Sequence, residues 1–322
     1  MNGAESLVRT LVAGGVDVCF TNPGTSEMHF VAALDRVDGM RCVLGLFEGV
    51  VTGAADGYAR MLDKPAATLL HLGPGLGNGL ANLHNAKKAS VPIVNIVGEH
   101  ATYHIEYDSP LTADIEGIAR PVSHWVKTSP SAKEVAADGA AAIQAARTSP
   151  GQIATLILPA NTAWNEGTGI AKTAAPAARH KVDDAAIENA ARVLKANGKD
   201  AMLMMTGIAL REKPLELAGR IAAATGCRIS AQWSNVRMQR GAGRVFIPRL
   251  PYAVDPALNV LKDVKHLVLC GARQPVAFFA YPDRCCKKRS GRKRLPAPSP
   301  WIRSARPWAR PCRRTPSSST NR

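Results

Sequence analysis

The chain has 322 residues, 46% of them hydrophobic and 20% charged, which is the composition of a soluble globular protein long enough for two domains. Its formal net charge of +16 is typical of nucleic-acid-binding proteins, yet 13 of the 41 basic residues and none of the 25 acidic ones lie in residues 284–322. The rest of the chain holds 28 basic against 25 acidic residues, so its charge does not favour nucleic acid as a partner.

Strands and helices alternate over the first hundred residues. An amphipathic spacing predicts a helix over residues 5–13, and an Asn-Pro-Gly turn precedes a capped helix start between Thr25 and Glu27. The alternation predicts a parallel sheet covered by helices, the α/β class. The other predicted elements are strands at 16–20, 43–46, 66–71 and 91–98 and helices at 50–62 and 80–89, with a glycine-rich loop between the third strand and the third helix.

Glu48 lies where a predicted strand meets a predicted helix, beside Phe47 and Val50. A carboxylate in the first turn of a helix is favoured by the helix dipole, and this simple structural role explains the position by itself. The apolar neighbours favour a functional role, because a carboxylate that loses hydration resists ionisation and can hold or pass a proton near neutral pH.

Thr25, Glu48 and His71 each lie at or just past the carboxyl end of a successive predicted strand. Ligands of open parallel sheets bind beyond these strand ends. We therefore expect the three polar groups to meet on one rim. Surface or hydrogen-bonded structural roles are favoured for the other nearby histidines, which are His29, His84, His100 and His104.

A second strand-helix alternation follows a segment without periodicity. Residues 102–114 are polar and irregular, and a helix at 132–147 and a buried strand at 152–159 complete the first domain, 1–165. Residues 166–181 are the expected linker. The second domain, 182–283, is expected to be an incomplete Rossmann-like unit, with helices at 182–195, 214–225 and 256–262 and strands at 201–206, 228–231 and 266–270.

Residues 284–322 are basic, rich in proline and without periodicity, so they cannot build a core. Two interpretations compete: a basic arm, or translation in a wrong frame after the second domain is interrupted, and we favour the second. The body cysteines Cys19, Cys42, Cys227 and Cys270 lie in or beside apolar runs and form no C-x-x-C pair, which favours buried free thiols. With no leader and no apolar run of 18 residues, we expect a cytoplasmic protein without a membrane partner.

Several segments in order resemble one known family. NPGTSE, GLFEGVVTGAADGYAR, GPGLGN and NIVGEH resemble the N-terminal, pyrimidine-binding domain of thiamin-diphosphate enzymes of the acetolactate synthase large-subunit and benzoylformate decarboxylase group. The resemblance covers residues 1–165 strongly and 182–283 weakly. It implies an enzyme acting on 2-keto acids by decarboxylation with or without carboligation, with thiamin diphosphate and Mg²⁺ as cofactors and an active site shared between subunits of a homo-oligomer.

The resemblance assigns roles to individual residues. Glu48 matches the glutamate that hydrogen-bonds N1′ of the aminopyrimidine and so activates the cofactor, and His71 matches a proton-transferring histidine of the decarboxylases. Thr25 lies where the decarboxylases place a serine near the substrate carboxylate. For His71, hydrogen bonding that merely caps the strand end is the alternative. The residues expected to contact the cofactor are Pro23, Gly24, Glu48, Gly75 and Asn78.

The family's Mg²⁺ and diphosphate site is expected elsewhere. The family holds both through a Gly-Asp-Gly segment, which these 322 residues lack, so we expect the chain to be inactive alone unless a separate diphosphate-binding subunit restores activity. The segment around Gly271 and Arg273 lacks the acidic run of flavin-binding members, which argues against FAD.

Three other functions stay open. The residues leave a benzoylformate decarboxylase-like enzyme or a non-enzymatic interaction protein as alternatives to the synthase-like assignment. A nicotinamide or flavin oxidoreductase is disfavoured, because the glycines of GPGLG do not follow the first strand and do not form G-x-G-x-x-G.

Overall fold

The computed structural model describes residues 1–279, so the expectations for residues 284–322 lie outside the described residues. The chain forms two compact units that divide between Arg179 and His180. Within the described residues, no helix has the length and apolar character needed to cross a lipid bilayer.

A six-stranded sheet is the centre of the first unit, and every pairing in it is parallel. The strand order β2-β1-β3-β4-β6-β5 confirms the predicted α/β class. The chain passes from β1 to β2 on one side and then to β3 on the other, so the carboxyl ends of β1 and β3 form a switch point. The strands are β1 (Val18–Asn22), β2 (Arg41–Leu44), β3 (Ala66–Leu70), β4 (Ile93–Glu99), β5 (Trp125–Thr128) and β6 (Ile153–Pro159).

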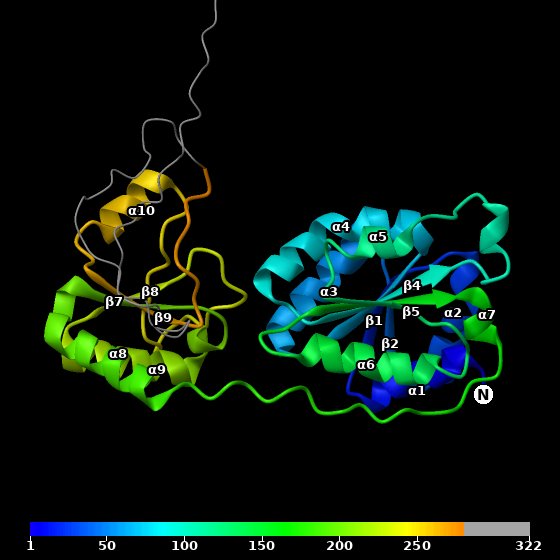
Figure 1. The fold of residues 1–322 in the computed structure, drawn as a ribbon, viewed down its shortest axis with the longest axis horizontal. Coiled ribbons are helices and arrows are strands. Elements are labelled where there is room, and N and C mark those ends of the chain that lie inside the picture. The colour runs from blue at the N-terminus through cyan, green and yellow to red at the C-terminus, as the bar shows by residue number, and fades with distance from the viewer. Residues whose placement is uncertain (280–322) are drawn as a thin grey trace, which may run out of the picture. The chain divides into compact units, whose positions relative to one another are not determined.

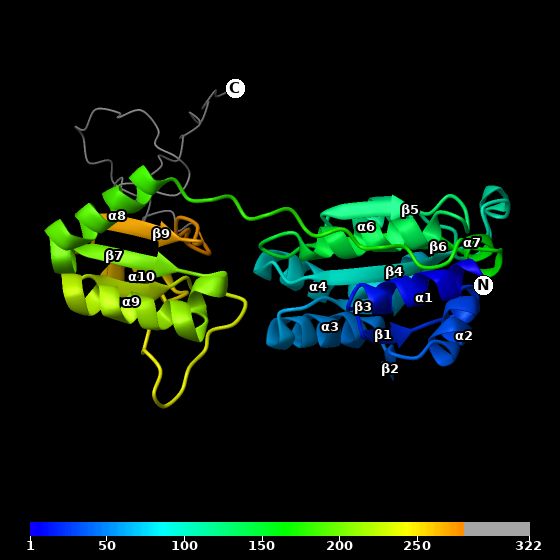
Figure 2. The same cartoon turned by 90° about the horizontal axis from the view of Figure 1, so that it is seen from below.

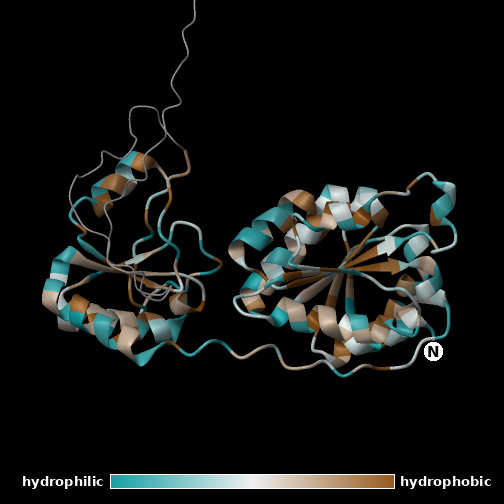
Figure 3. Ribbon diagram, viewed as in Figure 1, coloured by the Kyte–Doolittle hydropathy of each residue, from teal (hydrophilic) through white to brown (hydrophobic). Residues whose placement is uncertain are grey.

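Helices cover both faces of this sheet (Figures 1 and 2). One face carries α1 (Gly3–Ala13), α2 (Met28–Arg36) and α6 (Val135–Arg147), and the other carries α3 (Glu48–Leu62), α4 (Leu72–Ala89) and the short α5 (Ile115–Ala119). A last short helix, α7 (Ala160–Trp164), follows β6. The strands are the most hydrophobic elements of the unit, as expected for parallel strands that are covered on both sides (Figure 3).

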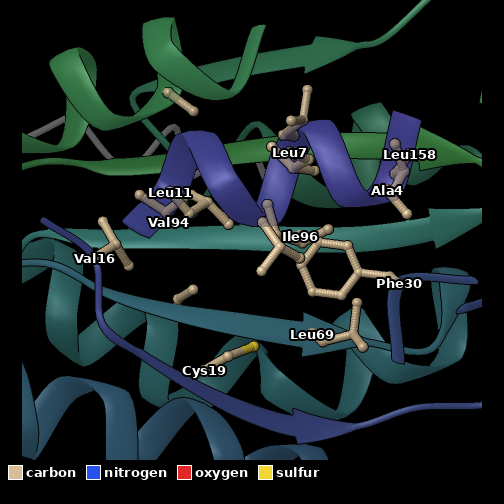
Figure 4. Close-up of a cluster of buried hydrophobic side chains, with 14 of the residues drawn as sticks. Ala4, Leu7, Leu11, Val16, Cys19, Phe30, Leu69, Val94, Ile96 and Leu158 are labelled. Carbon is tan, nitrogen blue, oxygen red and sulfur yellow. The ribbon is translucent and has the colours of Figure 1, made fainter. Parts of the chain in front are cut away.

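The main core lies between α1, α2, α6 and the sheet (Figure 4). Leu7 and Leu11 of α1 and Phe30 of α2 are fully buried, and they pack on strand residues that include Leu69 and Ile96. Each such side chain contributes roughly 1.5–3 kcal/mol through its burial. This packing fixes the strands whose carboxyl ends carry the polar residues.

A chain of buried hydrogen bonds crosses the other face of the sheet. Thr68 Oγ1 donates to Asn95 Oδ1 at 2.8 Å, and Asn95 Nδ2 donates to Thr155 Oγ1 at 3.0 Å. All three residues are fully buried, and the strand register places them side by side on β3, β4 and β6. The chain ends at Ser123, whose hydroxyl lies 2.7 Å from that of Thr155.

Asn95→Leu is expected to lower the free energy of unfolding by about 2 kcal/mol, because it leaves the buried Thr68 hydroxyl without a partner and takes from Thr155 one of its two partners. Urea unfolding followed by circular dichroism measures this loss. The double variant Thr68→Val/Asn95→Leu should lose less than the single variant, since it removes the orphaned Thr68 hydroxyl. A double variant that is less stable than the single one would contradict this explanation.

The prediction of a glycine-rich loop before residue 80 is wrong, because α4 begins at Leu72 and includes the whole glycine-rich segment. The glycines permit close packing of the helix, and this outweighs their low helix propensity. A Cβ on Gly79 would lie 2.8 Å from the Thr52 side chain of α3, and one on Gly73 would lie 2.6 Å from Ala113. Pro74 is tolerated because it falls in the first turn.

The prediction that all four body cysteines are buried needed correction. Cys19 and Cys227 are buried as predicted, but Cys42 and Cys270 are exposed, since the first lies on the edge strand β2 and the second at the end of β9 (His266–Cys270). All four are free thiols.

The expected linker lies along the first unit in part of its length. The backbone N–H groups of Gly169 and Ala171 donate to the hydroxyls of Ser6 and Thr10 in α1.

The second unit is a smaller parallel α/β structure. Its strands β7 (Ala201–Met205), β8 (Arg228–Ala231) and β9 pair in the order β8-β7-β9. Two clusters of buried side chains lie on the two faces of this sheet: the first includes Leu194 and Leu215, and the second includes Leu261. The helices that supply these leucines are α8 (Asp184–Asn197), α9 (Glu212–Thr225) and α10 (Val254–Leu261).

Candidate functional site

The candidate site lies at the carboxyl ends of β2, β1, β3 and β4, here called the strand-end rim. A turn that begins at Pro23 follows β1, α3 begins at Glu48 shortly after β2, and His71 links β3 to α4. Because these four strands are neighbours in the sheet, their ends bring residues far apart in the sequence to one edge. Glu48 and His71 therefore reach the same rim, as predicted.

Glu48 is the first residue of α3 and is only 7% exposed. Its Oε2 accepts a hydrogen bond of 2.9 Å from Nδ2 of Asn78, which α4 carries. The two helices are joined again where Asn82 donates to the backbone carbonyl of Gly49. A carboxylate at a helix N-terminus is stabilised by the helix dipole, and here a neighbouring amide also fixes its orientation.

Gly75 lies between Glu48 and His71. A Cβ at this position would fall 3.0 Å from Oε1 of Glu48 and 3.3 Å from Cβ of His71. The second carboxylate oxygen and the histidine thus border the same side of α4, and the missing side chain leaves room between them. The structure therefore brings Glu48, Asn78, Gly75 and His71 together.

The turn after β1 lies directly against His71. A Cβ on Gly24 would fall 2.2 Å from the ring atom Cε1, so this glycine is required by a side chain of the protein itself. Pro23 is half-buried in the same turn. Thr25 begins the short 3₁₀ helix Thr25–Glu27 and is exposed, and within the described part of the chain its hydroxyl has no hydrogen bond.

Sequence reasoning treated Glu27 only as a helix-capping residue, yet it is a central part of the rim. It is 3% exposed, and its Oε2 lies 2.8 Å from Nδ1 of His71 and accepts the backbone N–H of Gly24 at 2.7 Å. The capping pattern in the sequence accounts for only the second of these bonds. For the contact with His71, the only signal in the sequence was the position of Glu27, three residues after Gly24 in the NPGTSE segment that carries the family resemblance.

Glu99 and His100 extend the rim at the end of β4. Glu99 is buried, and its Oε1 accepts the backbone N–H of His100 at 2.7 Å. Burial raises the pKa of Glu99, although the bond from His100 acts in the opposite direction. Burial also lowers the pKa of His100, and the nearby His104 and His71 reinforce this effect.

Glu99→Gln is expected to stabilise the protein at neutral pH but not in acid. The folded-state pKa of Glu99 lies above the ordinary value of 4.5, which applies to the unfolded chain. At pH values between these two pKa values, the folded protein therefore binds more protons than the unfolded chain. Stability therefore falls as pH rises through this window, and glutamine removes the loss while it still accepts the N–H of His100.

Urea midpoints at about pH 7.5 and about pH 4 measure this effect. The variant should exceed the wild type only at the higher pH, whereas Glu106→Gln, a change at an exposed carboxylate, should match the wild type at both. An equal gain at both pH values would contradict the burial of a charged Glu99 as the cause.

Among the described residues, no three or more His, Cys, Asp or Glu side chains form a group that could hold a metal ion.

The backbone of the rim is strained at Leu72. This residue follows His71 directly and has φ of 49°, a left-handed backbone that a leucine rarely adopts. Such local strain is typical of functional sites, and here it occurs where the chain turns from β3 into α4.

Apolar side chains surround the approach to Glu48. Leu46 is 90% exposed and Phe47 is also exposed, both on the segment that joins β2 to α3, and Val50 is exposed in the first turn of α3. A buried carboxylate beside exposed apolar groups can receive a ligand that pairs a polar ring atom with a flat apolar surface.

The first part of the chain matches a known family model. Residues 1–119 match the model described as thiamine pyrophosphate enzyme, N-terminal TPP binding domain.

Curated relatives and a solved structure resemble longer stretches. The chain is 56% identical over 283 residues to the "Putative acetolactate synthase large subunit IlvX" of Mycobacterium tuberculosis. The aligned region covers 88% of this chain and 54% of that protein. It is 34% identical over 137 residues to benzoylformate decarboxylase of Pseudomonas aeruginosa, covering 42% of this chain and 26% of the relative. The fold is similar to that of a thiamine diphosphate-dependent 4-hydroxybenzoylformate decarboxylase of Rhodococcus jostii, with a TM-score of 0.73, 22% identity and coverage of 84% of this chain and 51% of that one. The chain thus spans about half the length of IlvX and of the Rhodococcus decarboxylase.

Proposed function

We propose that this chain supplies the pyrimidine-binding side of a thiamin-diphosphate site acting on 2-keto acids, because residues 1–119 match the model of the N-terminal TPP-binding domain of thiamine pyrophosphate enzymes. The observation that carries the proposal is the position of Glu48. Its carboxylate is buried at a helix N-terminus and held by Asn78, and its second oxygen borders the space left by Gly75.

The residues of the rim fit the pyrimidine end of the cofactor. Oε1 of Glu48 can pair with a ring nitrogen, while Gly75 and the backbone of Pro23 and Gly24 admit a flat ring. The cofactor, when bound, supplies a nucleophilic carbon that attacks the 2-keto group and an electron sink for the loss of carbon dioxide. The cofactor binds Mg²⁺ through its diphosphate group. We place the protein groups that would hold the ion and the diphosphate outside the strand-end rim.

Each rim residue then has a separate task. Glu48 exchanges a proton with the ring nitrogen of the pyrimidine, from a position that is largely kept from water. His71 moves a proton to or from the reacting 2-keto acid. Thr25 offers an exposed hydroxyl to the substrate carboxylate.

We assign acetolactate synthase-like chemistry, because the extended sequence match is to a protein named as a synthase subunit. The second candidate is decarboxylation alone, as in benzoylformate decarboxylase-like enzymes. One observation favours it: His71 is held on the rim by Glu27, which positions a group that can pass a proton to the carbon that loses the carboxylate. Pyruvate and benzoylformate are the substrates that separate the two.

Association with further subunits follows from the same surface. Leu46, Phe47 and Val50 leave apolar area exposed next to the catalytic carboxylate, and a second copy that covers it would exclude water from the site. We therefore propose a homo-oligomer whose site is completed at this surface, in the cytoplasm.

The test measures thiamin-diphosphate binding by calorimetry, and turnover of pyruvate and benzoylformate, on the purified chain with Mg²⁺. Both measurements are repeated with a chain that carries a diphosphate-binding domain of the same family. Binding that depends on Glu48 supports the proposal. If the cofactor binds in neither arrangement, the proposed function is wrong.

A further inference from the structure

Glu27 and His71 form a pair that the proposed role of Glu48 does not use. Nδ1 of His71 lies 2.8 Å from Oε2 of Glu27. The Glu27 side chain is 1% exposed, whereas that of His71 is 25% exposed. The carboxylate is therefore the enclosed member of the pair, and the imidazole is the member that a ligand can reach.

Two glycines make room for this pair. A Cβ on Gly24 would fall 2.2 Å from Cε1 of His71, and one on Gly98 would fall 1.6 Å from Oε1 of Glu27. The ring thus lies directly against the turn after β1, and the carboxylate lies directly against β4. The N–H of Gly24 also donates to Oε2 of Glu27, which fixes the carboxylate further.

The hydrogen bond determines which ring nitrogen carries the proton. An ionised carboxylate only accepts hydrogen bonds, so Nδ1 of His71 must donate. The neutral imidazole then has a lone pair on Nε2, and within the described residues no protein group hydrogen-bonds to this atom. A buried carboxylate that accepts the Nδ1 proton of a histidine leaves Nε2 as the acid-base atom, as it does in hydrolytic triads.

We propose that Glu27 is a positioning residue, which accepts the Nδ1 proton of His71 and so makes Nε2 the atom that exchanges a proton with the reacting 2-keto acid. In decarboxylation the bond to the carboxylate breaks, carbon dioxide leaves, and one proton takes its place on carbon. Nε2 first takes this proton from water, which leaves hydroxide, then gives it to the carbon and returns to its lone pair, while Nδ1 keeps its own proton throughout. The identity of the substrate rests on the proposed function, whereas the pair itself does not.

His100 supports the assignment through its environment. Its Nε2 and Oε1 of Glu27 are both enclosed atoms without a hydrogen-bond partner among the described residues. Burial lowers the pKa of His100, although the nearby Glu27 acts in the opposite direction, so a second cation beside Glu27 is disfavoured.

Nitrogen-15 NMR of histidine-labelled protein tests the proposal without a substrate. The wild type should show His71 protonated at Nδ1 and unprotonated at Nε2, with the signals assigned by their loss in His71→Asn. Glu27→Gln should keep this pattern, because its amide oxygen still accepts from Nδ1. Glu27→Leu should lose it, while His84, an exposed histidine that has no hydrogen bond within residues 1–279, serves as the unchanged reference in every spectrum.

Protonation at Nε2 in the wild type, or an unchanged pattern in Glu27→Leu, would overturn the proposal. If Glu27→Leu does not fold, the spectra of the wild type and Glu27→Gln still decide it. In turnover assays with the diphosphate-binding domain supplied, Glu27→Leu should lower kcat about 100-fold with little change in KM, and Glu27→Gln should recover part of the loss. If no form turns over a 2-keto acid while the NMR result holds, the proposed function fails and the pair stands; if Glu27→Leu turns over like the wild type, the positioning role is wrong.

Discussion

With a diphosphate-binding domain of the same family supplied, Glu48→Gln is expected to slow deuterium exchange at C2 of thiamin diphosphate by about 100-fold or more relative to the wild-type chain. Glutamine has nearly the same shape and can still accept the hydrogen bond from Asn78, but it cannot hold or release a proton at the ring nitrogen. The loss is therefore in acid-base chemistry and not in packing. Proton NMR follows the exchange directly, since the C2 signal disappears as deuterium enters, and no substrate turnover is needed.

Glu212→Gln is the matched control for this experiment. Glu212 is also the first residue of a helix, α9, but it lies in the second unit and is exposed. Its replacement should leave the exchange rate unchanged, which separates the effect of Glu48 from that of a carboxylate at any helix N-terminus. Equal rates for Glu48→Gln and the wild type, or a wild type that does not accelerate exchange at all, would show that this chain does not activate the cofactor.

The periodicity of apolar residues was sufficient to predict most of the fold. The strands at 228–231 and 266–270 have the predicted bounds. For the second, a continuous apolar run from Leu267 to Cys270 leaves little choice of structure. The short edge elements β5 and α5 were missed. Their residues pack against neighbouring elements that only the folded chain supplies, and their own pattern is too short to show a period.

From the sequence, we could place only those residues of the candidate site that follow a recognisable local pattern. Glu48 and His71 follow apolar runs, so the strand-end rule placed both on one edge. The glycines before Asn78 were assigned to a loop because propensity favours it, although the close approach of α4 to α3 requires them inside a helix. The contact between Glu27 and His71 joins residues 44 positions apart, and no local pattern indicates which carboxylate reaches which ring.

Gly98→Ala is expected to lower the free energy of unfolding by about 3 kcal/mol. The added Cβ would fall 1.6 Å from Oε1 and 2.5 Å from Cδ of Glu27. Gly98 lies in the fully buried strand β4, and the carboxylate is held on its other side by His71 and the turn after β1, so neither can move without breaking hydrogen bonds. Chemical unfolding measures the loss, and the histidine spectrum should show whether the His71 pair is broken in the folded fraction.

Gly77→Ala provides the matched control, because a Cβ there would meet nothing within 4 Å. In the middle of α4 this change should leave stability unaltered or raise it by about 0.5–1 kcal/mol, since alanine has the better helix propensity. The double variant Glu27→Ala/Gly98→Ala removes the carboxylate that the new methyl group meets. It should therefore be more stable than the sum of the two single changes predicts, by about 1 kcal/mol or more. Strict additivity would mean that the carboxylate does not fill the space over Gly98, and the enclosure of Glu27 that keeps His71 in place would then be wrong.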